Sequence, residues 1–211
     1  IDDSDLARLG KIDAVIISHD HFDHLDYPTI KKIDKQVEHY FVPLAVGEHL
    51  RKWGVEDSRI TELDWWDETV YQGLKLACTP GQHFSGRDPR HRNSSLWCSW
   101  VIAGENYKIF FSGDSGYFSG FAKIGEKYGP FDLAIMECGQ YNELWHEIHM
   151  VPEESVQAAQ DLSAEKMLPV HNSAFNLSIH SWDEPLNRAH VEAEKKKVSV
   201  IKVIPGETFS L

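Results

Sequence analysis

Four metal-binding side chains crowd into six residues directly after a short apolar run. Residues 12–17 (IDAVII) have the composition of a buried strand, and residues 19–24 (HDHFDH) follow it. An α/β fold builds a site in this way, where a strand ends in a loop that carries ligands. Imidazole nitrogen and carboxylate oxygen suit zinc and its neighbours. A solvated histidine-rich loop is the other interpretation of this segment taken alone.

Strand-like and helix-like segments alternate along the 211 residues, which predicts α/β layers. No internal repeat, low-complexity tract or linker interrupts them, so we expect residues 1–211 to form a single domain. We expect strands at 12–17, 37–42, 59–63, 69–78, 96–103, 107–112, 132–137, 167–170 and 198–204, and helices at 44–53, 152–162 and 184–197.

Composition and charge limit the kinds of partner and environment that suit this protein. A content of 42% hydrophobic and 26% charged residues predicts a packed core. The net charge of −12 argues against a broad nucleic-acid-binding face. No apolar stretch is long enough to span a bilayer, which leaves peripheral membrane contact open. The formation of a homo-oligomer also remains open. Cys78, Cys98 and Cys138 are too scattered for a disulfide framework, which favours the cytoplasm, although a targeting segment before Ile1 remains open.

Further candidate ligands recur at one kind of place. His83, Asp114 and His171 each lie just past an expected strand, as His19 does. Open α/β folds bind ligands where such loops meet at one edge of a sheet. We therefore expect these side chains to converge.

The order of these residues resembles the metallo-β-lactamase superfamily. The carrying pattern is HxHxDH at 19–24, then His83, Gly113-Asp114 and His171. The resemblance implies a four-layer αββα sandwich with a two-metal site in the cleft between its sheets. It implies a first metal held by His19, His21 and His83, a second held by Asp23, His24 and His171, and Asp114 as the bridge.

Ligand identity narrows the chemistry within that superfamily. Asp114 stands where zinc β-lactamases use a thiolate, so antibiotic hydrolysis is not expected. His21 stands where flavodiiron-type members use glutamate, which favours zinc, although manganese and iron remain open. Two divalent ions can share a bridging hydroxide that acts as the nucleophile. Asp23 either orients this hydroxide and accepts its proton or serves as a ligand alone.

A narrower resemblance covers the chain from His19 to about Pro185. It is to the bacterial RomA-like proteins, which are similar to N-acylphosphatidylethanolamine-hydrolysing phospholipase D. This resemblance implies phosphodiester cleavage, with His149 close to the metals in a substrate or proton-transfer role. The alternative for His149 is a helix-entry residue bonded to backbone. The carrying segments are 80–85 (PGQHFS), 92–97 (RNSSLW), 111–117 (FSGDSGY), 124–132 (IGEKYGPFD) and 149–154 (HMVPEE).

Three arginines follow His83 on one predicted loop. Arg87, Arg90 and Arg92 can attract and bind an anionic substrate, because arginine pairs with phosphate and carboxylate in a forked geometry. Ion pairs with Asp88 and its neighbours are the alternative. His39, His49 and His190 lie in charged, periodic segments, and we expect them on the surface.

The N-terminus departs from the superfamily pattern. Several strands normally precede the HxHxDH loop, whereas 18 residues precede it here. We therefore expect an N-terminally incomplete domain in which the strand at 12–17 lies at an open edge. The leading hypothesis is a phosphodiesterase acting on a phospholipid or a related small molecule. A lactonase like the ascorbate-6-phosphate lactonase group and a non-catalytic metal-binding protein are the alternatives.

Overall fold

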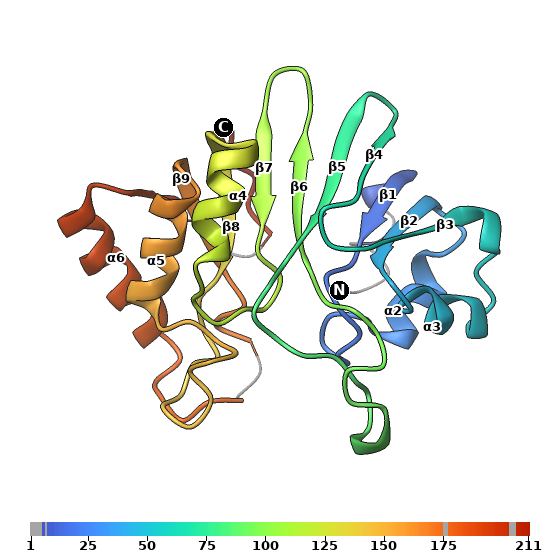
Figure 1. The fold of residues 1–211 in the computed structure, drawn as a ribbon, viewed down its shortest axis with the longest axis horizontal. Coiled ribbons are helices and arrows are strands. Elements are labelled where there is room, and N and C mark those ends of the chain that lie inside the picture. Colours follow the sequence, from blue (N-terminus) through green and yellow to red (C-terminus); the bar gives the residue numbers. More distant parts are fainter. Residues whose placement is uncertain (1–5, 7, 175–176, 203–205) are drawn as a thin grey trace. The chain divides into compact units, whose positions relative to one another are not determined.

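The computed structural model describes residues 6, 8–174, 177–202 and 206–211 of the chain. The chain forms two compact units, each described here by itself. Unit 1 consists of Ile1–Asp67 and Phe84–Cys98, and unit 2 of Glu68–His83 and Ser99–Leu211. Each unit contains one sheet and the helices that pack on it (Figure 1).

Unit 1 is built on a parallel sheet of three strands in the order β1-β2-β3. Its helices α2 and α3 bury their apolar residues against this sheet, around Tyr40, Val42 and Leu50. The start of α2 is set by Asp26, whose carboxylate accepts a hydrogen bond from the Thr29 amide at 2.9 Å. The elements are β1 (Ile12–Ile16), α2 (Tyr27–Ile33), β2 (Val37–Pro43), α3 (Gly47–Lys52) and β3 (Ile60–Leu63).

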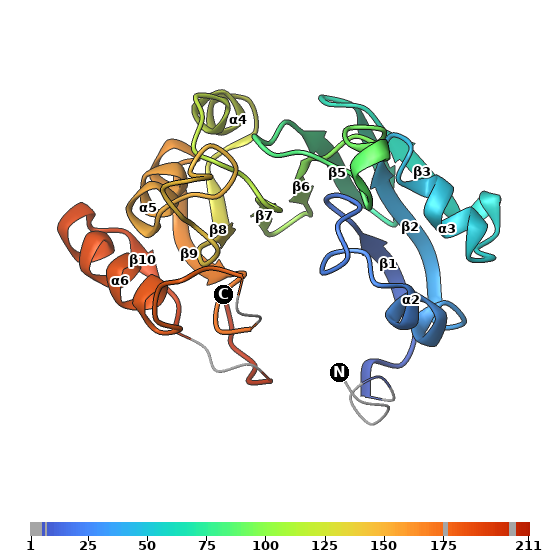
Figure 2. The ribbon, with the colours of Figure 1, turned by 90° about the horizontal axis from the view of Figure 1, so that it is seen from below.

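Unit 2 is built on a mixed sheet of seven strands in the order β10-β9-β8-β7-β6-β5-β4. Helices α4, α5 and α6 pack on one face of it (Figures 1 and 2). The elements are β4 (Glu68–Tyr71), β5 (Leu74–Thr79), β6 (Ser99–Ala103), β7 (Lys108–Phe111), α4 (Gly120–Tyr128), β8 (Phe131–Glu137), α5 (Pro152–Asp161), β9 (Ala164–Val170), α6 (Glu184–Lys196) and β10 (Ser199–Val200).

Strand direction in unit 2 determines where its loops meet. Strands β7, β8 and β9 are parallel neighbours, so their carboxyl ends lie at one edge of the sheet. Strand β5 points the same way as β7, because β6 is antiparallel to both. The loops after β5, β7, β8 and β9 therefore begin at a common edge, which is where an open α/β sheet builds a ligand site.

Most of the expected elements are confirmed, and the differences have local causes. The expected strand at 69–78 is two antiparallel strands, β4 and β5, because Gln72 and Gly73 take positive φ angles of 49° and 83° in a tight turn. The expected helix at 44–53 begins only at Gly47, after a turn. The last strand is short, at Ser199–Val200, and residues 203 and 204 of the expectation lie outside the described residues. Helices α2 and α4 were not expected.

Strand β1 is an outer strand of the unit 1 sheet in the described part of the chain. In that part, no helix has the length and apolar character needed to cross a membrane.

The core of unit 2 offers a stability test. Phe110 is fully buried, with its ring centroid 5.6 Å from that of Phe131 and 6.2 Å from that of Phe121. Phe110→Ala should lower the free energy of unfolding by about 3–5 kcal/mol, because it removes this packing and leaves a cavity. The control Val70→Ala, at a side chain 72% exposed on β4, should change it by less than about 0.5 kcal/mol. Chemical denaturation monitored by circular dichroism measures both, and equal losses would contradict this account of the core.

Candidate metal centre

The loop after β1 gathers three imidazoles within unit 1. It turns tightly because the amides of His24 and Leu25 both donate to the carbonyl oxygen of His21, at 3.1 and 2.8 Å. The ring centroid of His19 lies 4.5 Å from that of His21 and 4.2 Å from that of His24. Oδ2 of Asp23 lies 3.5 Å from Nε2 of His24. Four of the expected ligands are thus neighbours on one loop.

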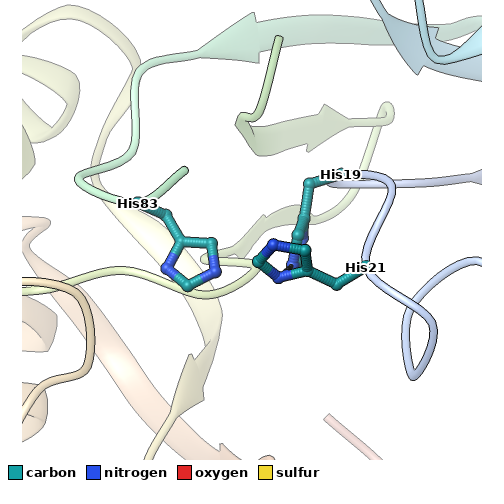
Figure 3. A group of neighbouring side chains, drawn as sticks. All are labelled: His19, His21 and His83. Atoms are coloured by element: carbon teal, nitrogen blue, oxygen red, sulfur yellow. Dashed lines mark hydrogen bonds between the residues drawn. The ribbon is translucent and has the colours of Figure 1, made fainter. Parts of the chain in front are cut away.

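Two of these imidazoles face each other in a way that suits a metal. Nε2 of His19 lies 3.0 Å from Nδ1 of His21, while Nδ1 of His19 faces the Ser18 hydroxyl at 2.9 Å. Two nitrogens that bind one tetrahedral zinc are about 3.3 Å apart. Figure 3 shows His19 and His21 on this loop, and His83 on the loop after β5. Nitrogen donors at this spacing fit a zinc-like ion.

Asp114 connects two other expected ligands within unit 2. Its carboxylate is buried, with Oδ2 3.8 Å from Nε2 of His83 and Oδ1 3.5 Å from Nδ1 of His171. The three residues follow β5, β7 and β9, as the common sheet edge requires. Each oxygen of the carboxylate thus faces a different histidine. This arrangement fits a carboxylate that bridges two ions.

The backbone at His171 is held in a restricted conformation. His171 itself has a φ of 61°, an uncommon angle for a residue with a side chain. Gly139, which follows β8, passes so close that a Cβ there would lie 1.9 Å from the carbonyl oxygen of His171. Nδ1 of His83 faces the carbonyl oxygen of Ile148 at 3.0 Å. Close packing therefore restricts the backbone of His171, and the hydrogen bond to Ile148 directs the imidazole of His83.

His149 is paired with a carboxylate. Glu137, the last residue of β8, is fully buried, and its Oε2 and Oε1 lie 3.0 and 3.3 Å from Nδ1 of His149. The His149 ring stacks on that of His171 at 5.7 Å and meets that of His83 at 5.1 Å. Donors of Asp114, Glu137, His149 and His171 all lie within 4.8 Å of one another. The alternative of a helix-entry residue bonded to backbone does not describe this contact.

Burial and charge act in opposite directions on this pair. Burial raises the pKa of Glu137, because it disfavours the carboxylate form. Burial alone would lower the pKa of His149, but the hydrogen bond to Glu137 and its negative charge outweigh that effect and raise it. With Nδ1 directed at Glu137, the remaining nitrogen of His149 is the one that can serve a substrate.

The three arginines have different surroundings within unit 1. Nη1 of Arg87 donates to the carbonyl oxygens of Asp20 and Leu25. Arg90 is 85% exposed, and its Nε lies 3.4 Å from Asp88, as the ion-pair alternative expected. The Arg92 guanidinium lies 4.1 Å from the ring centroid of Phe84. Arg87 is thus engaged with backbone, while substrate binding by Arg90 and Arg92 stays a prediction.

Sequence reasoning missed three residues around these ligands. Glu137 was read only as the end of a buried strand. Asp20 is buried, and its carboxylate lies 3.3 Å from Nε2 of His49, a residue that we expected on the surface. Burial opposes the Asp20 carboxylate, but the hydrogen bonds from His49 and from Gly86 outweigh it and lower its pKa. A charged residue directly beside a ligand was the available signal for Asp20.

Comparisons with known proteins identify the family to which this chain belongs. The family model described as "Beta-lactamase superfamily domain" matches residues 3–172. An uncharacterised protein of Mycobacterium tuberculosis is 45% identical over 206 residues, which are 96% of this chain and 55% of that protein. N-acyl-phosphatidylethanolamine-hydrolyzing phospholipase D 1 of Caenorhabditis elegans is 34% identical over 222 residues, 97% of this chain and 62% of that enzyme. The chain therefore spans about half to two thirds of the length of these relatives.

A shorter relative and a solved structure complete the comparison. RomA of Klebsiella pneumoniae, described as an outer membrane protein, is 47% identical over 119 residues, 53% of this chain and 89% of RomA. The structure of Igni18, a metallo hydrolase of Ignicoccus hospitalis, matches 99% of this chain and 83% of its own with a TM-score of 0.77 and 21% identity. That likeness confirms the expected α/β fold class. The chain belongs to the metallo-β-lactamase superfamily of metal-dependent hydrolases, and its relatives include RomA and N-acylphosphatidylethanolamine-hydrolysing phospholipase D.

Proposed function

We propose that this protein is a phosphodiesterase with two divalent metal ions, zinc in the first place and manganese or iron as substitutes. The donors are imidazole nitrogens and carboxylate oxygens, with no thiolate among the expected ligands, and this set suits those ions. The likeness to a phospholipase D that hydrolyses N-acyl-phosphatidylethanolamine supports a phosphodiester as the substrate class.

The proposal rests on the carboxylate of Asp114, whose two oxygens face different histidines. Its Oδ2 faces His83 and its Oδ1 faces His171, which are the histidines assigned to the first and the second metal. In this proposal His19, His21 and His83 hold the first ion, Asp23, His24 and His171 hold the second, and Asp114 contacts both. The unit 1 ligands are assigned to the two ions by their positions in the HxHxDH pattern.

Bound divalent ions supply a nucleophilic water at neutral pH and offset charge that develops on the phosphoryl oxygens. His149 then has the chemistry to deliver a proton to the departing alkoxide, because Glu137 holds its Nδ1 and keeps the charged imidazolium favourable. Asp23 would help to hold the second ion, and its carboxylate would be placed to orient a water and accept a proton. Arg90 and Arg92 add positive charge that attracts an anionic substrate.

The substrate proposal is a phospholipid or a small-molecule phosphodiester, with peripheral membrane contact for the former. Cytoplasmic location is part of the proposal, because Cys78, Cys98 and Cys138 are buried as thiols and a reducing compartment keeps them so.

Metal content and turnover test the function together. Wild-type protein should bind close to two zinc ions per chain and hydrolyse a chromogenic phosphodiester. Asp114→Asn should lower turnover at least about 100-fold, because each bound ion contributes several kcal/mol of charge stabilisation. Elemental analysis and steady-state kinetics measure both quantities.

The control for that variant is Asp13→Asn, which removes the same charge from a side chain that is 61% exposed on β1. It should retain wild-type metal content and turnover. Two bound ions with hydrolysis of a lactone but of no phosphodiester would contradict the proposed substrate class, and two ions without turnover of either would favour a binding protein.

The Glu137–His149 pair predicts a non-additive loss of activity. His149→Ala should lower kcat by about 10²–10⁴-fold on a phosphodiester with an alkoxide leaving group, because the departing oxygen then lacks its proton donor. Glu137→Ala should lower kcat less, and the double variant no more than His149→Ala, since Glu137 acts through His149.

Two controls accompany this comparison of single and double variants. One is a substrate with a different leaving group, and the other is a variant at a nearby carboxylate. A nitrophenolate leaving group needs no proton, so the effect of His149→Ala should shrink on such a substrate. Glu143→Ala, at an exposed carboxylate on the same loop, should leave kcat unchanged. Fully additive losses in the double variant would show that Glu137 acts independently of His149.

A further inference from the structure

One arginine holds both ends of the metal-binding loop in unit 1. Nη1 of Arg87 donates a hydrogen bond of 2.7 Å to the carbonyl oxygen of Asp20 and another of 2.7 Å to that of Leu25. Asp20 follows the first histidine of the loop, and Leu25 directly follows the last. A single nitrogen carries two N–H groups, so it supplies one to each end of the loop.

Two aromatic rings lie against the same guanidinium. Its central carbon lies 4.0 Å from the ring centroid of Phe22, which is part of the loop, and 5.4 Å from that of Trp53 at the end of α3. Stacking of a planar cation on aromatic faces is a favourable contact. The guanidinium therefore touches the loop through its backbone at two points and through Phe22 at a third.

The residue before Arg87 makes the reciprocal contact. The amide of Gly86 donates to Oδ1 of Asp20 at 2.7 Å. Gly86 has a φ of 128°, and a Cβ there would lie 2.8 Å from the carbonyl oxygen of His91, so this tight path needs glycine. Asp20 thus accepts from Gly86 through its side chain and from Arg87 through its backbone. These contacts connect residues 86–87 to the start of the loop twice.

We propose that Arg87 is a positioning residue that holds the HxHxDH loop in its metal-binding shape, and that it does not bind substrate. The inference rests on the ligand set of the proposed function, to which this loop contributes His19, His21, Asp23 and His24. The N–H groups of Nη1 are directed at backbone carbonyls on both sides of His21, Asp23 and His24, where they fix the distance between the two ends of the loop.

The expected consequence is a loss of metal affinity. A loop that carries three imidazoles and a carboxylate must keep them in place before the ion arrives, and groups that orient metal ligands are worth roughly 10–100-fold in affinity. Arginine suits this role because its planar guanidinium presents N–H groups in fixed directions. Lysine has a single ammonium on a flexible four-carbon stem and lacks the planar guanidinium, so it can satisfy such contacts only in part.

Metal titration of the metal-free full chain tests the inference. Arg87→Ala should bind Zn²⁺ roughly 10–100-fold more weakly than wild type in a chelator competition, and Arg87→Lys should lie between the two. Arg90→Ala is the matched control, because it removes an equal charge from an exposed side chain on the same loop, and its affinity should be unchanged. Circular dichroism of the metal-free forms checks that each variant is folded; if Arg87→Ala is not, Arg87→Lys carries the comparison.

Cobalt absorption supplies a readout that a general loss of stability would not produce. Co²⁺ bound to wild type and to Arg90→Ala should give the same visible bands, whereas bands of Arg87→Ala should shift or weaken as the ligand geometry relaxes. The substrate-binding alternative predicts instead unchanged metal affinity and spectrum with a higher KM for an anionic phosphodiester, and that result would overturn the inference. Metal binding by wild type that equals binding by Arg87→Ala would refute the inference alone, whereas no metal in wild type would overturn the proposed function and this inference with it.

Discussion

The strand order of unit 2 is the constraint that brings three loops together at the buried carboxylate of Asp114. Its two oxygens face His83 and His171, which arrive from separate strands. Both histidines reach it because β5, β7 and β9 all end at the same sheet edge. A seven-stranded sheet with helices packed on one face therefore holds three ligand-bearing loops in register.

Residues behind the ligands determine how the ligands are presented. Glu137 directs Nδ1 of His149, and the close passage of Gly139 constrains the backbone of His171. In unit 1, Arg87 donates to the backbone of the HxHxDH loop, and the Asp20 carboxylate accepts from Gly86. Both groups use buried charge with hydrogen-bonding partners, which is the condition for tolerating charge away from water. The chemistry of such a site depends on these partners as well as on the ligands.

Prediction from sequence succeeded for most of the strands and for the convergence of three expected ligands in unit 2, and it failed for the supporting residues. Strand periodicity and the position of His83, Asp114 and His171 after strands are local signals, and the structure brings these three together as expected. Glu137 carries no such signal, because a glutamate at the end of an apolar run also suits a strand that emerges into solvent. The turn between β4 and β5 was missed because its Gln72-Gly73 pair lies inside a run of strand-forming residues.

The sequence by itself determined the superfamily, the α/β class and the order of seven expected ligands, because each depends on residue type and spacing along the chain. Only the tertiary structure decided that Glu137 faces His149 and that Arg87 holds the loop after β1 rather than standing free in the arginine loop. The physical reason is that both contacts join residues distant in sequence. A buried or partly buried charge pairs with whichever partner folding brings within hydrogen-bond distance, and spacing along the chain does not encode that choice.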